Sequence, residues 1–279
     1  MFLITGANGQ LGLCLKDLLQ DKAVYHDIDT LDITDEHSVL NLAQKNSFEA
    51  IINCAAYTNV DKAEDEPILA QKVNAQGPAN LAKLAAKLNI PLVHISTDYV
   101  FDGKQNTPLT EEEPTSPLGV YGRTKLEGEE KVLKYARTAL IIRTAWLYSP
   151  YGKNFVKTML NLADNHKQIR VVSDQVGTPT YAPHLAQTIL EVLPKFEKGK
   201  KEIFHYTDAG IASWYDFAYY AIKLAGKPAE VLPIATKDYP TKAVRPSYSV
   251  LSKEKIIKTF NIHLSHWTRG VEQCLKKLS

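Results

Sequence analysis

Short apolar runs alternate with longer amphipathic stretches along the first half of the chain. The runs of strand length cover residues 2–5, 23–27, 50–56, 90–97 and 138–148. The stretches with helical spacing cover residues 9–19, 35–45, 67–88 and 121–135, and Asp35 is placed to cap the second of them. Because short strands that are apolar almost throughout must be covered on both faces, the pattern predicts a doubly wound parallel sheet, a Rossmann-like α/β fold.

After about Trp146 the regular alternation weakens. Helical spacing returns at residues 155–164, 184–193 and 214–225, and long loops separate these segments. No low-complexity linker marks a boundary, so we expect two lobes that share segments. We place the first domain at residues 1–147, with about 182–200 returning to it, and a smaller C-terminal lobe mainly at residues 148–279.

Composition and charge narrow the class of protein. Hydrophobic residues make up 44% and charged residues 23% of the chain, which is typical of a soluble globular protein. A net charge of +2 gives no reason to expect nucleic acid or a membrane surface as a partner. No apolar run reaches the roughly 18 residues of a membrane helix. We also expect no signal peptide and, from three widely spaced cysteines, reduced thiols in a cytoplasmic protein.

A glycine-rich loop follows the first predicted strand. In ITGANGQLG, Gly6, Gly9 and Gly12 are spaced three apart and lead directly into the first predicted helix. Glycines allow a tight turn and a close approach of backbone to ligand, and a helix N-terminus attracts a diphosphate. We therefore interpret the loop as a nucleotide-cofactor site rather than a structural turn, which makes the first domain dinucleotide-binding.

An acidic residue ends the second predicted strand, about twenty residues after the loop. Asp27 is placed to accept the ribose hydroxyls of the adenosine half, although an aspartate here is also common in turns. Residues 28–33 contain no Arg or Lys, while Asp29 and Asp32 add negative charge. Since a 2′-phosphate would be repelled, we predict NADH or NADPH as cofactor, with NADH used at least as well.

Small side chains mark the end of the third predicted strand. Cys54, Ala55 and Ala56 in NCAAYT would let a cofactor lie against the backbone at the ligand-binding edge of the sheet. Tight packing of a helix on the sheet would favour the same residues, and the two interpretations are compatible.

A hydroxyl pair and a Tyr-x-x-x-Lys motif supply candidate chemistry. Ser96 and Thr97 end the fourth predicted strand, at the same edge. Tyr121 and Lys125 are four apart on the next predicted helix and therefore share a face, about 5–6 Å apart at Cβ. The alternative is an ordinary salt-bridged surface helix, whose i,i+4 pairs would be Lys125–Glu129, Glu127–Lys131 and Glu130–Lys134.

The catalytic interpretation explains why the tyrosine and the lysine share a face. A free tyrosine has a pKa of about 10, which is too high for efficient proton transfer at neutral pH. A neighbouring ammonium lowers that pKa, so Lys125 would activate Tyr121 while also donating to the nicotinamide ribose. Tyr121 would then protonate a carbonyl oxygen, held by Thr97, as a hydride reaches the carbon.

Taken together, these motifs resemble the extended short-chain dehydrogenase/reductase family. The likeness rests on GANGQLG, NCAAYT, VNAQG with Asn74, STDYVF and YGRTK. It extends over nearly the whole chain through RTAWLYSPYGKNFVKTML, DQVGTPTYA, GIASWYDFA and RPSYSVL. Within the family, the chain is most similar to the branch that reduces dTDP-linked 4-keto sugars. The resemblance implies reduction of the C4 keto group of dTDP-4-dehydro-L-rhamnose to give dTDP-L-rhamnose.

The resemblance also implies individual site residues. Those for the cofactor are Gly6, Asn8, Gly9, Gln10, Leu11, Asp27, Asp32, Ile33, Ala55, Ala56, Tyr57, Thr58, Tyr121 and Lys125. Those for catalysis are Thr97, Tyr121 and Lys125, and those for the substrate are Thr97, Asp98, Tyr99 and Trp146. To the substrate site we add Arg245, with Lys153 as a further candidate, because a nearly neutral chain must gather local positive charge to bind a diphosphate; a surface role is the alternative.

Some positions keep a second interpretation or depart from the family pattern. Trp146 can pack in the core instead of against a sugar or base, and His94 is expected to be a hydrogen-bonded core residue. Family members that dimerise through magnesium use glutamates, whereas the first helix here, QLGLCLKDLLQ, has none. We therefore predict no metal site and expect a monomer or a homodimer.

Rival functions remain open. A dehydratase of the family resembles Thr-Asp-Glu at the catalytic threonine, whereas this chain has Thr97-Asp98-Tyr99 and lacks the second carboxylate that elimination needs. An epimerase is excluded less firmly. A non-catalytic NAD(P)-binding subunit, resembling the regulatory subunit of methionine adenosyltransferase, would not need a proton donor, so the retention of Tyr121 favours an enzyme.

Overall fold

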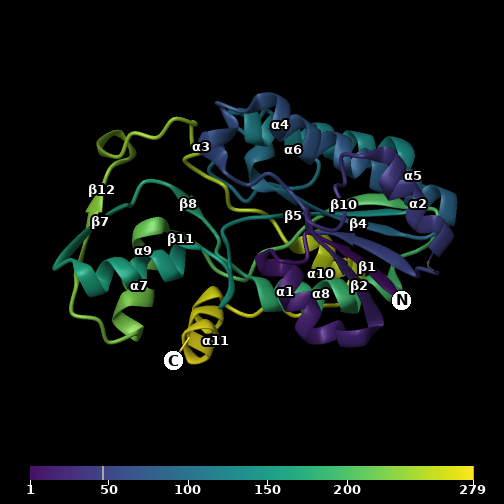
Figure 1. Ribbon diagram of the computed structural model, residues 1–279. Coiled ribbons are helices and arrows are strands. Elements are labelled where there is room, and N and C mark those ends of the chain that lie inside the picture. Colours follow the sequence, from purple (N-terminus) through teal and green to yellow (C-terminus); the bar gives the residue numbers. More distant parts are fainter. Residues whose placement is uncertain (46, 279) are drawn as a thin grey trace.

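Among residues 1–45 and 47–278, which the computed structural model describes, six parallel strands form the sheet of the larger lobe (Figure 1). Their order is β10-β5-β4-β3-β1-β2. Their bounds are β1 Phe2–Thr5, β2 Ala23–His26, β3 Ala50–Asn53, β4 Leu92–Thr97, β5 Ala139–Thr144 and β10 Lys201–His205. The predicted doubly wound, Rossmann-like fold is confirmed.

Helices cover both faces of this sheet (Figure 1). One face carries α1 (Gln10–Leu19), α8 (Ala182–Val192) and α10 (Glu254–Phe260). The other carries α2 (Glu36–Lys45), α5 (Gly77–Leu88) and α6 (Val120–Tyr135). Successive strand residues point to opposite faces, so Ile4 packs with the first set and Leu3 with the second. Because both sets are buried, the strands are apolar at most positions.

The fifth predicted strand is interrupted. The apolar run 138–148 ends as β5 at Thr144, and the short strand β6 (Leu147–Tyr148) follows after a break. Trp146 lies at the break with a φ of +48°, in the left-handed region that a strand cannot continue through. The break turns the chain out of the sheet and into the smaller lobe.

The predicted helix over residues 67–88 is also divided. It consists of α4 (Pro67–Gln71), the π-helical turn η2 (Lys72–Gln76) and α5. Asn74 lies in the π-helical turn, and its side chain accepts the N–H of Tyr57 at 2.8 Å and donates to the Tyr57 carbonyl at 3.1 Å. The turn therefore holds in place the segment that follows β3.

The expected start of α2 is confirmed. The Asp35 carboxylate accepts the backbone N–H groups of His37 and Ser38, which are free at the beginning of a helix.

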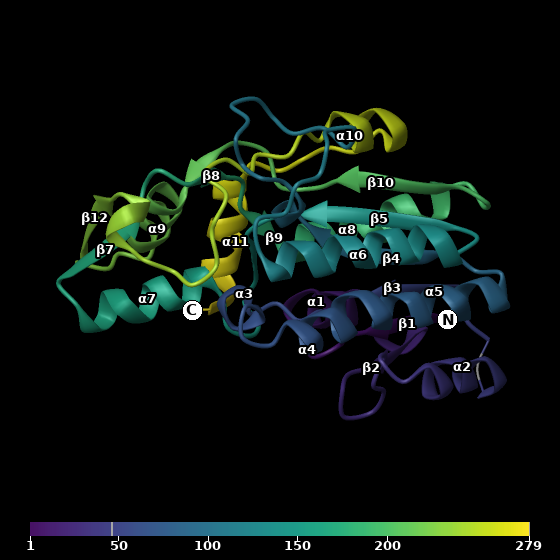
Figure 2. The same ribbon diagram turned by 90° about the horizontal axis from the view of Figure 1, so that it is seen from above.

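The smaller lobe lies beyond the carboxyl ends of the strands, and the β5 and β10 arrows point toward it (Figure 2). Its helices are α7 (Phe155–Asn165), α9 (Trp214–Leu224) and α11 (Trp267–Leu278). Its strands β7 (Gln168–Val172) and β12 (Glu230–Ile234) pair in parallel. Aromatic side chains on these helices, including Phe217 and Trp267, form its core.

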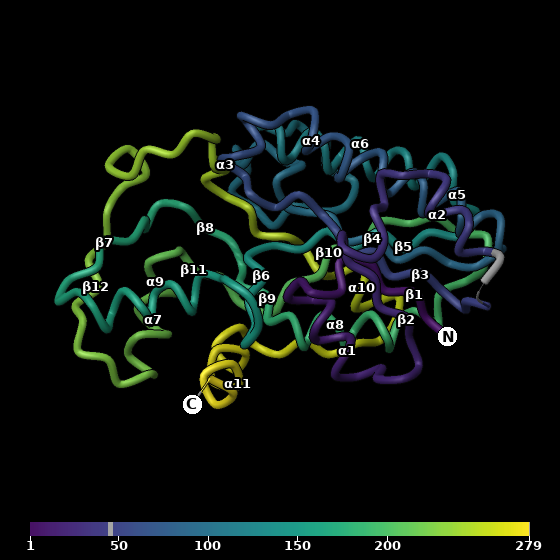
Figure 3. Tube along the Cα trace, viewed as in Figure 1, coloured from purple at the N-terminus to yellow at the C-terminus, as the bar shows by residue number. Residues whose placement is uncertain are grey.

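The chain passes between the lobes repeatedly (Figure 3). Helix α8 packs against α1, and β10 and α10 also belong to the sheet layers, although all three follow the first segments of the smaller lobe. The two lobes are therefore built from interleaved segments.

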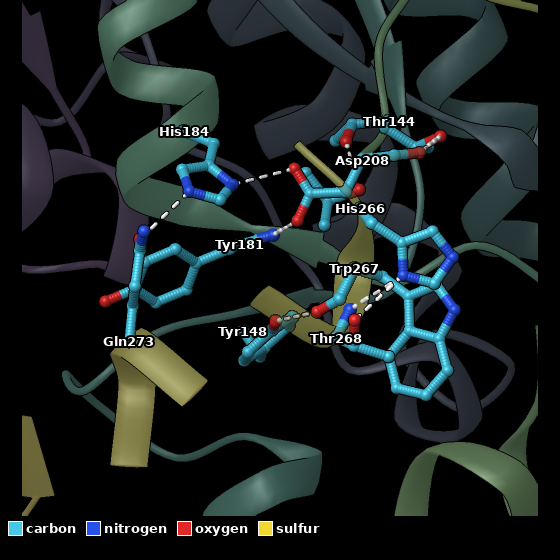
Figure 4. A network of polar contacts seen from close by, with 11 residues as sticks. Thr144, Tyr148, Tyr181, His184, Asp208, His266, Trp267, Thr268 and Gln273 are labelled. Carbon is cyan, nitrogen blue, oxygen red and sulfur yellow. Dashed lines mark hydrogen bonds and ion pairs between the residues drawn. The ribbon is translucent and has the colours of Figure 1, made fainter. Parts of the chain in front are cut away.

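A buried polar network ties α11 to the sheet layers (Figure 4). His184 on α8 faces Asp208 through Nδ1 and Gln273 on α11 through Nε2, each at 3.0 Å. Asp208 is fully buried and also accepts the backbone N–H of Tyr181 at 3.1 Å. These hydrogen bonds offset the cost of burying the carboxylate and hold the two lobes together.

Candidate active site

A cavity of about 840 Å³ lies at the carboxyl ends of the sheet strands and reaches α9 of the smaller lobe. All the residues predicted for cofactor and catalysis line it: Gly6, Asn8, Gly9, Gln10, Leu11, Asp27, Asp32, Ile33, Ala55, Ala56, Tyr57, Thr58, Thr97, Tyr121 and Lys125. Of the predicted substrate residues, Asp98, Tyr99, Trp146 and Lys153 also line it. The fold thus brings together groups from at least five separate segments of the chain.

The glycine loop forms one wall of the cavity. Gly6 has a φ of +67°, and a Cβ there would lie 2.5 Å from the backbone nitrogen of Ala55. A Cβ at Gly12 would lie 2.4 Å from the Gly6 carbonyl oxygen. Gly9 begins α1 without a side-chain cap, so the first N–H groups of the helix are available to a ligand. This cradle fits the diphosphate of a dinucleotide.

Asp27 shapes the same wall. Its carboxylate accepts the backbone N–H of Asn8 and that of Ile28, each at 2.8 Å. It therefore fixes the glycine loop to the turn after β2, as the turn interpretation expected, while it also lines the cavity where a ribose is predicted. The structural role is observed, and the contact with a ribose stays a prediction.

The candidate catalytic groups converge on the other side of the cavity. The Tyr121 phenol hydrogen-bonds the Thr97 hydroxyl, and the Tyr99 ring meets the Tyr121 ring edge-on at 5.5 Å between centroids. The Lys125 ammonium donates to the Ile95 carbonyl at 2.7 Å and is only 2% exposed. Helix α6 thus presents Tyr121 and Lys125 to the end of β4.

The pKa of the phenol is shifted in the opposite direction from the one expected. Burial raises the pKa of Tyr121 above its ordinary value, and its hydrogen bond with Thr97 only partly offsets this effect. Burial also lowers the pKa of Lys125 to about 8, against the opposing effect of Glu129. The expected lowering of the Tyr121 pKa fails here because burial dominates and the ammonium is directed to Ile95.

The surface-helix alternative is wrong for the face that carries the motif. Lys125 and Glu129 are both buried, and the Glu129 carboxylate pairs with Arg143 of β5. On the outer face the expected Glu127–Lys131 pair is present at 2.8 Å. Helix α6 therefore has a salt-bridged outer side and an inner side whose Tyr121 and Lys125 line the cavity.

The Thr97 hydroxyl is oriented by its neighbours. It donates to the Asp98 carboxylate at 3.0 Å and accepts the backbone N–H of Tyr99 at 3.2 Å. Asp98 is buried, and this burial raises its pKa to about 6 even though hydrogen bonds from Thr97 and Ser249 oppose the shift. The arrangement places two hydroxyls and a carboxyl group beside one point of the cavity.

Comparison with known proteins identifies the scaffold. The family model of the RmlD substrate binding domain matches residues 1–279. The chain belongs to the RmlD family.

Members of the RmlD family with assigned names resemble the chain over its whole length. A dTDP-4-dehydrorhamnose reductase of Aggregatibacter actinomycetemcomitans is 42% identical and covers 97% of this chain and 96% of its own length. The crystal structure of a dTDP-4-dehydrorhamnose reductase from Clostridium acetobutylicum is 43% identical, with a TM-score of 0.94 and 99% of each chain covered. That of the Bacillus anthracis enzyme, in complex with NADP, is 36% identical with a TM-score of 0.95, covering 99% of this chain and 98% of that one. These relatives are oxidoreductases, and the RmlD-family chain described here is an enzyme of that class.

In this RmlD-family chain, Trp214 also lines the cavity, and the sequence analysis did not predict it as a site residue. Its indole stacks on that of Trp146, with ring centroids 3.6 Å apart and an angle of 12° between the planes. Trp146 comes from the end of β5 and Trp214 from the start of α9, so the stack joins the two lobes across the cavity. Trp146 therefore both packs against an aromatic partner and faces the site. Only the family-typical segment GIASWYDFA gave a signal for Trp214.

The Gln10 side chain has a role that sequence reasoning missed. It donates to the Leu147 carbonyl at 3.3 Å and accepts hydrogen bonds from Ser149 at 3.0 Å and Asn154 at 3.1 Å. These partners belong to the loop that carries Lys153. The glycine-loop wall of the cavity and the segment that carries Lys153 are thus fixed to each other.

The structure also shows where Arg245 and His94 lie. Arg245 is not among the cavity-lining residues; it pairs with Asp61 at 2.7 Å and lies over the Tyr99 ring, so its predicted contact with the substrate stays a prediction. His94 is fully buried and its Nδ1 is 3.0 Å from the Asn53 side chain, so the expected core role is confirmed.

The described residues hold no group of three or more His, Cys, Asp or Glu side chains arranged to bind a metal ion. In residues 1–45 and 47–278, no helix is both long and apolar enough to cross a bilayer.

The raised pKa of Asp98 predicts a pH-dependent stability difference. Above its unfolded-state pKa near 3.8 the unfolded carboxyl loses its proton, whereas the folded one keeps it until about pH 6. The folded state therefore binds more protons in this window, and the stability that Asp98 contributes falls as the pH rises through it. We expect the free energy of unfolding of the unsubstituted chain, relative to Asp98→Asn, to fall by roughly 2 kcal/mol between pH 4 and pH 7, measured by urea unfolding. A difference that rises with pH would contradict the assignment.

Proposed function

We propose that this RmlD-family enzyme reduces the C4 keto group of dTDP-4-dehydro-L-rhamnose with a nicotinamide cofactor and forms dTDP-L-rhamnose. The observation that carries the proposal is the convergence of the Tyr121 and Thr97 hydroxyls and the Lys125 ammonium beside a glycine cradle in one cavity. The names of the relatives support the identity of the sugar nucleotide.

The cofactor would be held by the glycine cradle, the turn at Asp27 and the small residues after β3. Gly9, Gln10 and Leu11 would give backbone N–H groups to the diphosphate, and Ala55 and Ala56 would lie against its middle. When bound, the reduced nicotinamide supplies the hydride. Lys125 would donate to the nicotinamide ribose with ammonium protons not used by Ile95, since an ammonium has three donors.

Proton transfer is assigned to Tyr121. A buried phenol with a raised pKa stays protonated, which is the form that a proton donor needs. Thr97 would turn its hydroxyl proton from Asp98 to the substrate carbonyl oxygen, placing that oxygen beside Tyr121. The oxygen becomes the hydroxyl at C4.

The neighbouring residue disfavours the dehydratase alternative. Tyr99 stands where a second carboxylate would be needed, and burial raises its pKa to about 12. A neutral phenol at that position cannot serve as a base at neutral pH. The site has one carboxyl group beside the catalytic threonine, which suits reduction better than elimination.

The substrate assignment is tested by following NADH or NADPH oxidation with dTDP-4-dehydro-L-rhamnose. UDP- and GDP-linked 4-keto-6-deoxy sugars are assayed in parallel at the same concentrations. We expect turnover of the dTDP compound with kcat/KM well above that of the others. Turnover of only a UDP- or GDP-linked sugar would refute the assignment of the dTDP-linked substrate and leave the proposed reduction intact. No cofactor oxidation with any of the sugars would refute the reductase proposal.

The cofactor preference follows from the charge at Asp27. A carboxylate that lines the cavity at the ribose would repel a 2′-phosphate, so NADH should be used at least as well as NADPH. Asp27→Asn keeps an oxygen for the Asn8 N–H and removes the charge, and it should lower the KM for NADPH relative to NADH about tenfold. Asp238→Asn, the same change in the exposed turn η5 (Thr236–Asp238) outside the cavity lining, should leave the ratio unchanged. A much lower KM for NADPH in the unsubstituted enzyme would contradict the preference.

A further inference from the structure

A buried charge network lies directly behind the catalytic lysine. Glu129 follows Lys125 by one helical turn, and it is 1% exposed. Its carboxylate accepts two parallel hydrogen bonds from Arg143 of β5, Nε to Oε1 at 2.9 Å and Nη2 to Oε2 at 2.7 Å. It also accepts a hydrogen bond from the Ser96 hydroxyl. Glu129 and Arg143 are charged, although most of the neighbouring buried residues of α6 and β5 are apolar. Because a buried ion pair adds little stability, stability alone does not explain why this pair is there.

The network continues the catalytic stripe of α6. Tyr121, Lys125 and Glu129 are spaced by four and face the last residues of β4. They contact, in that order, the hydroxyl of Thr97, the carbonyl of Ile95 and the hydroxyl of Ser96. The helix and the strand are therefore joined by three polar contacts, one from each of these side chains, and Glu129 makes the contact nearest the C-terminal end of the helix.

Two titratable groups close to Lys125, Cys54 and His94, are neutral. Burial raises the pKa of the Cys54 thiol, and burial together with the Lys125 charge lowers the pKa of His94 well below its ordinary value. His205, beyond Arg143, has a pKa lowered to about 3 by burial and by the Arg143 charge. The charged and titratable groups that interact with Lys125 are Glu129, Cys54 and His94. The elements around it, α6, β4, β5 and η3 (Asp98–Val100), also carry Tyr121, Arg143, Asp98 and Tyr99. Of the interacting groups, Glu129 and Cys54 are those whose charged forms favour the Lys125 ammonium. Because burial raises the pKa of the Cys54 thiol and keeps it neutral, the Glu129 carboxylate supplies the favourable charge.

We propose that Glu129 is a positioning residue that keeps Lys125 protonated in its buried site, and that Arg143 and Ser96 hold the Glu129 carboxylate away from direct pairing with that lysine. Burial alone would favour the neutral amine, and the carboxylate one turn away opposes this. The Arg143 fork occupies both carboxylate oxygens, so the Lys125 donors remain available to Ile95 and to a ligand in the cavity. The inference rests on the proposed function for its catalytic meaning.

Titration of Lys125 tests this proposal without requiring turnover. The full-length chain is labelled with ¹³C,¹⁵N-lysine, the Lys125 signal is assigned with Lys125→Arg, and its midpoint is followed by NMR as the pH is changed. Glu129→Gln should lower the midpoint by about one pH unit, because the favourable charge is lost. Arg143→Met should raise it, because the freed carboxylate then pairs with Lys125. Glu127→Gln, the same change on the outer face of α6, should leave it unchanged.

The opposite signs separate an electrostatic role from a structural one. A merely structural role predicts that both inner variants shift the midpoint in the same direction or leave it unchanged, and either result would overturn the proposal. If Glu129→Gln does not fold, as judged by circular dichroism, Arg143→Met decides alone: a rise supports the proposal and no rise refutes it. In kinetic assays Glu129→Gln should move the alkaline fall of kcat to lower pH by the same amount. Absence of turnover in the unsubstituted enzyme would count against the proposed function only, since the titration stands without it.

Discussion

Replacing Tyr121 by phenylalanine is expected to lower kcat for sugar reduction by about 10²–10⁴-fold, the usual contribution of a positioned proton donor. The substitution removes one oxygen atom from a ring that packs edge-on against Tyr99, so the packing of α6 is kept. Without the phenol, the developing alkoxide must take its proton from water, which the buried site restricts. Affinity for NADH should stay within about twofold, measured by fluorescence titration beside steady-state kinetics.

The matched control for this variant is Tyr135→Phe. Tyr135 ends the same helix at the surface, where its ring meets Lys83 and Lys134, contacts that phenylalanine keeps. We expect kcat of this control to equal that of the unsubstituted enzyme. If Tyr121→Phe retained full kcat with cofactor bound, the assignment of the proton donor would be wrong, and the binding-subunit alternative would gain support.

Gly6→Ala should weaken cofactor binding by about a hundredfold, the effect of moving a binding group by roughly 1 Å. The new Cβ would lie 2.5 Å from the backbone nitrogen of Ala55, so the glycine loop or the end of β3 must shift. Both segments line the cofactor side of the cavity, and neither can move as a flexible side chain would. Isothermal titration with NADH measures the loss, and thermal unfolding shows whether the variant is folded.

Gly226→Ala separates the effect of the contact from that of the backbone conformation. Gly226 has a φ of +64°, close to the +67° of Gly6, but no atom lies within 4 Å of a Cβ built there. Both variants therefore carry the cost of a left-handed alanine, about 1 kcal/mol, and only Gly6→Ala carries the collision. Equal cofactor affinities in the two variants would show that the close packing of Gly6 on Ala55 does not matter for binding.

The fold could be predicted from periodicity because the sheet is covered on both faces. Runs such as residues 50–52 and 139–142 are apolar at every position because both faces of their strands are buried, and few other folds require this. What periodicity could not show is where the backbone departs from regular geometry. The left-handed φ of Trp146 and the π-helical turn at Asn74 arise from tertiary contacts, and local sequence carries no sign of them.

The meeting of residues in one cavity was predictable where a motif fixes both residue type and position, as at Gly6, Thr97 and Tyr121. The candidate site was not predictable where function depends on burial. The charges along α6 suggested a solvated helix, yet Glu129 and Lys125 are buried, and Arg143 of the strand that follows α6 pairs with the glutamate. The predicted direction of the Tyr121 pKa shift was wrong for the same reason, because the desolvation of a side chain cannot be judged from residue spacing.

Hydride transfer to the sugar C4 is the most direct test of the proposed reaction. The enzyme is incubated with dTDP-4-dehydro-L-rhamnose and NADH that carries two deuterium atoms at C4 of the dihydronicotinamide, and the product is examined by mass spectrometry and proton NMR. The account predicts dTDP-L-rhamnose that is heavier by one deuterium, with the proton signal at sugar C4 absent. Deuterium at another sugar carbon, or a product that has gained none, would contradict it.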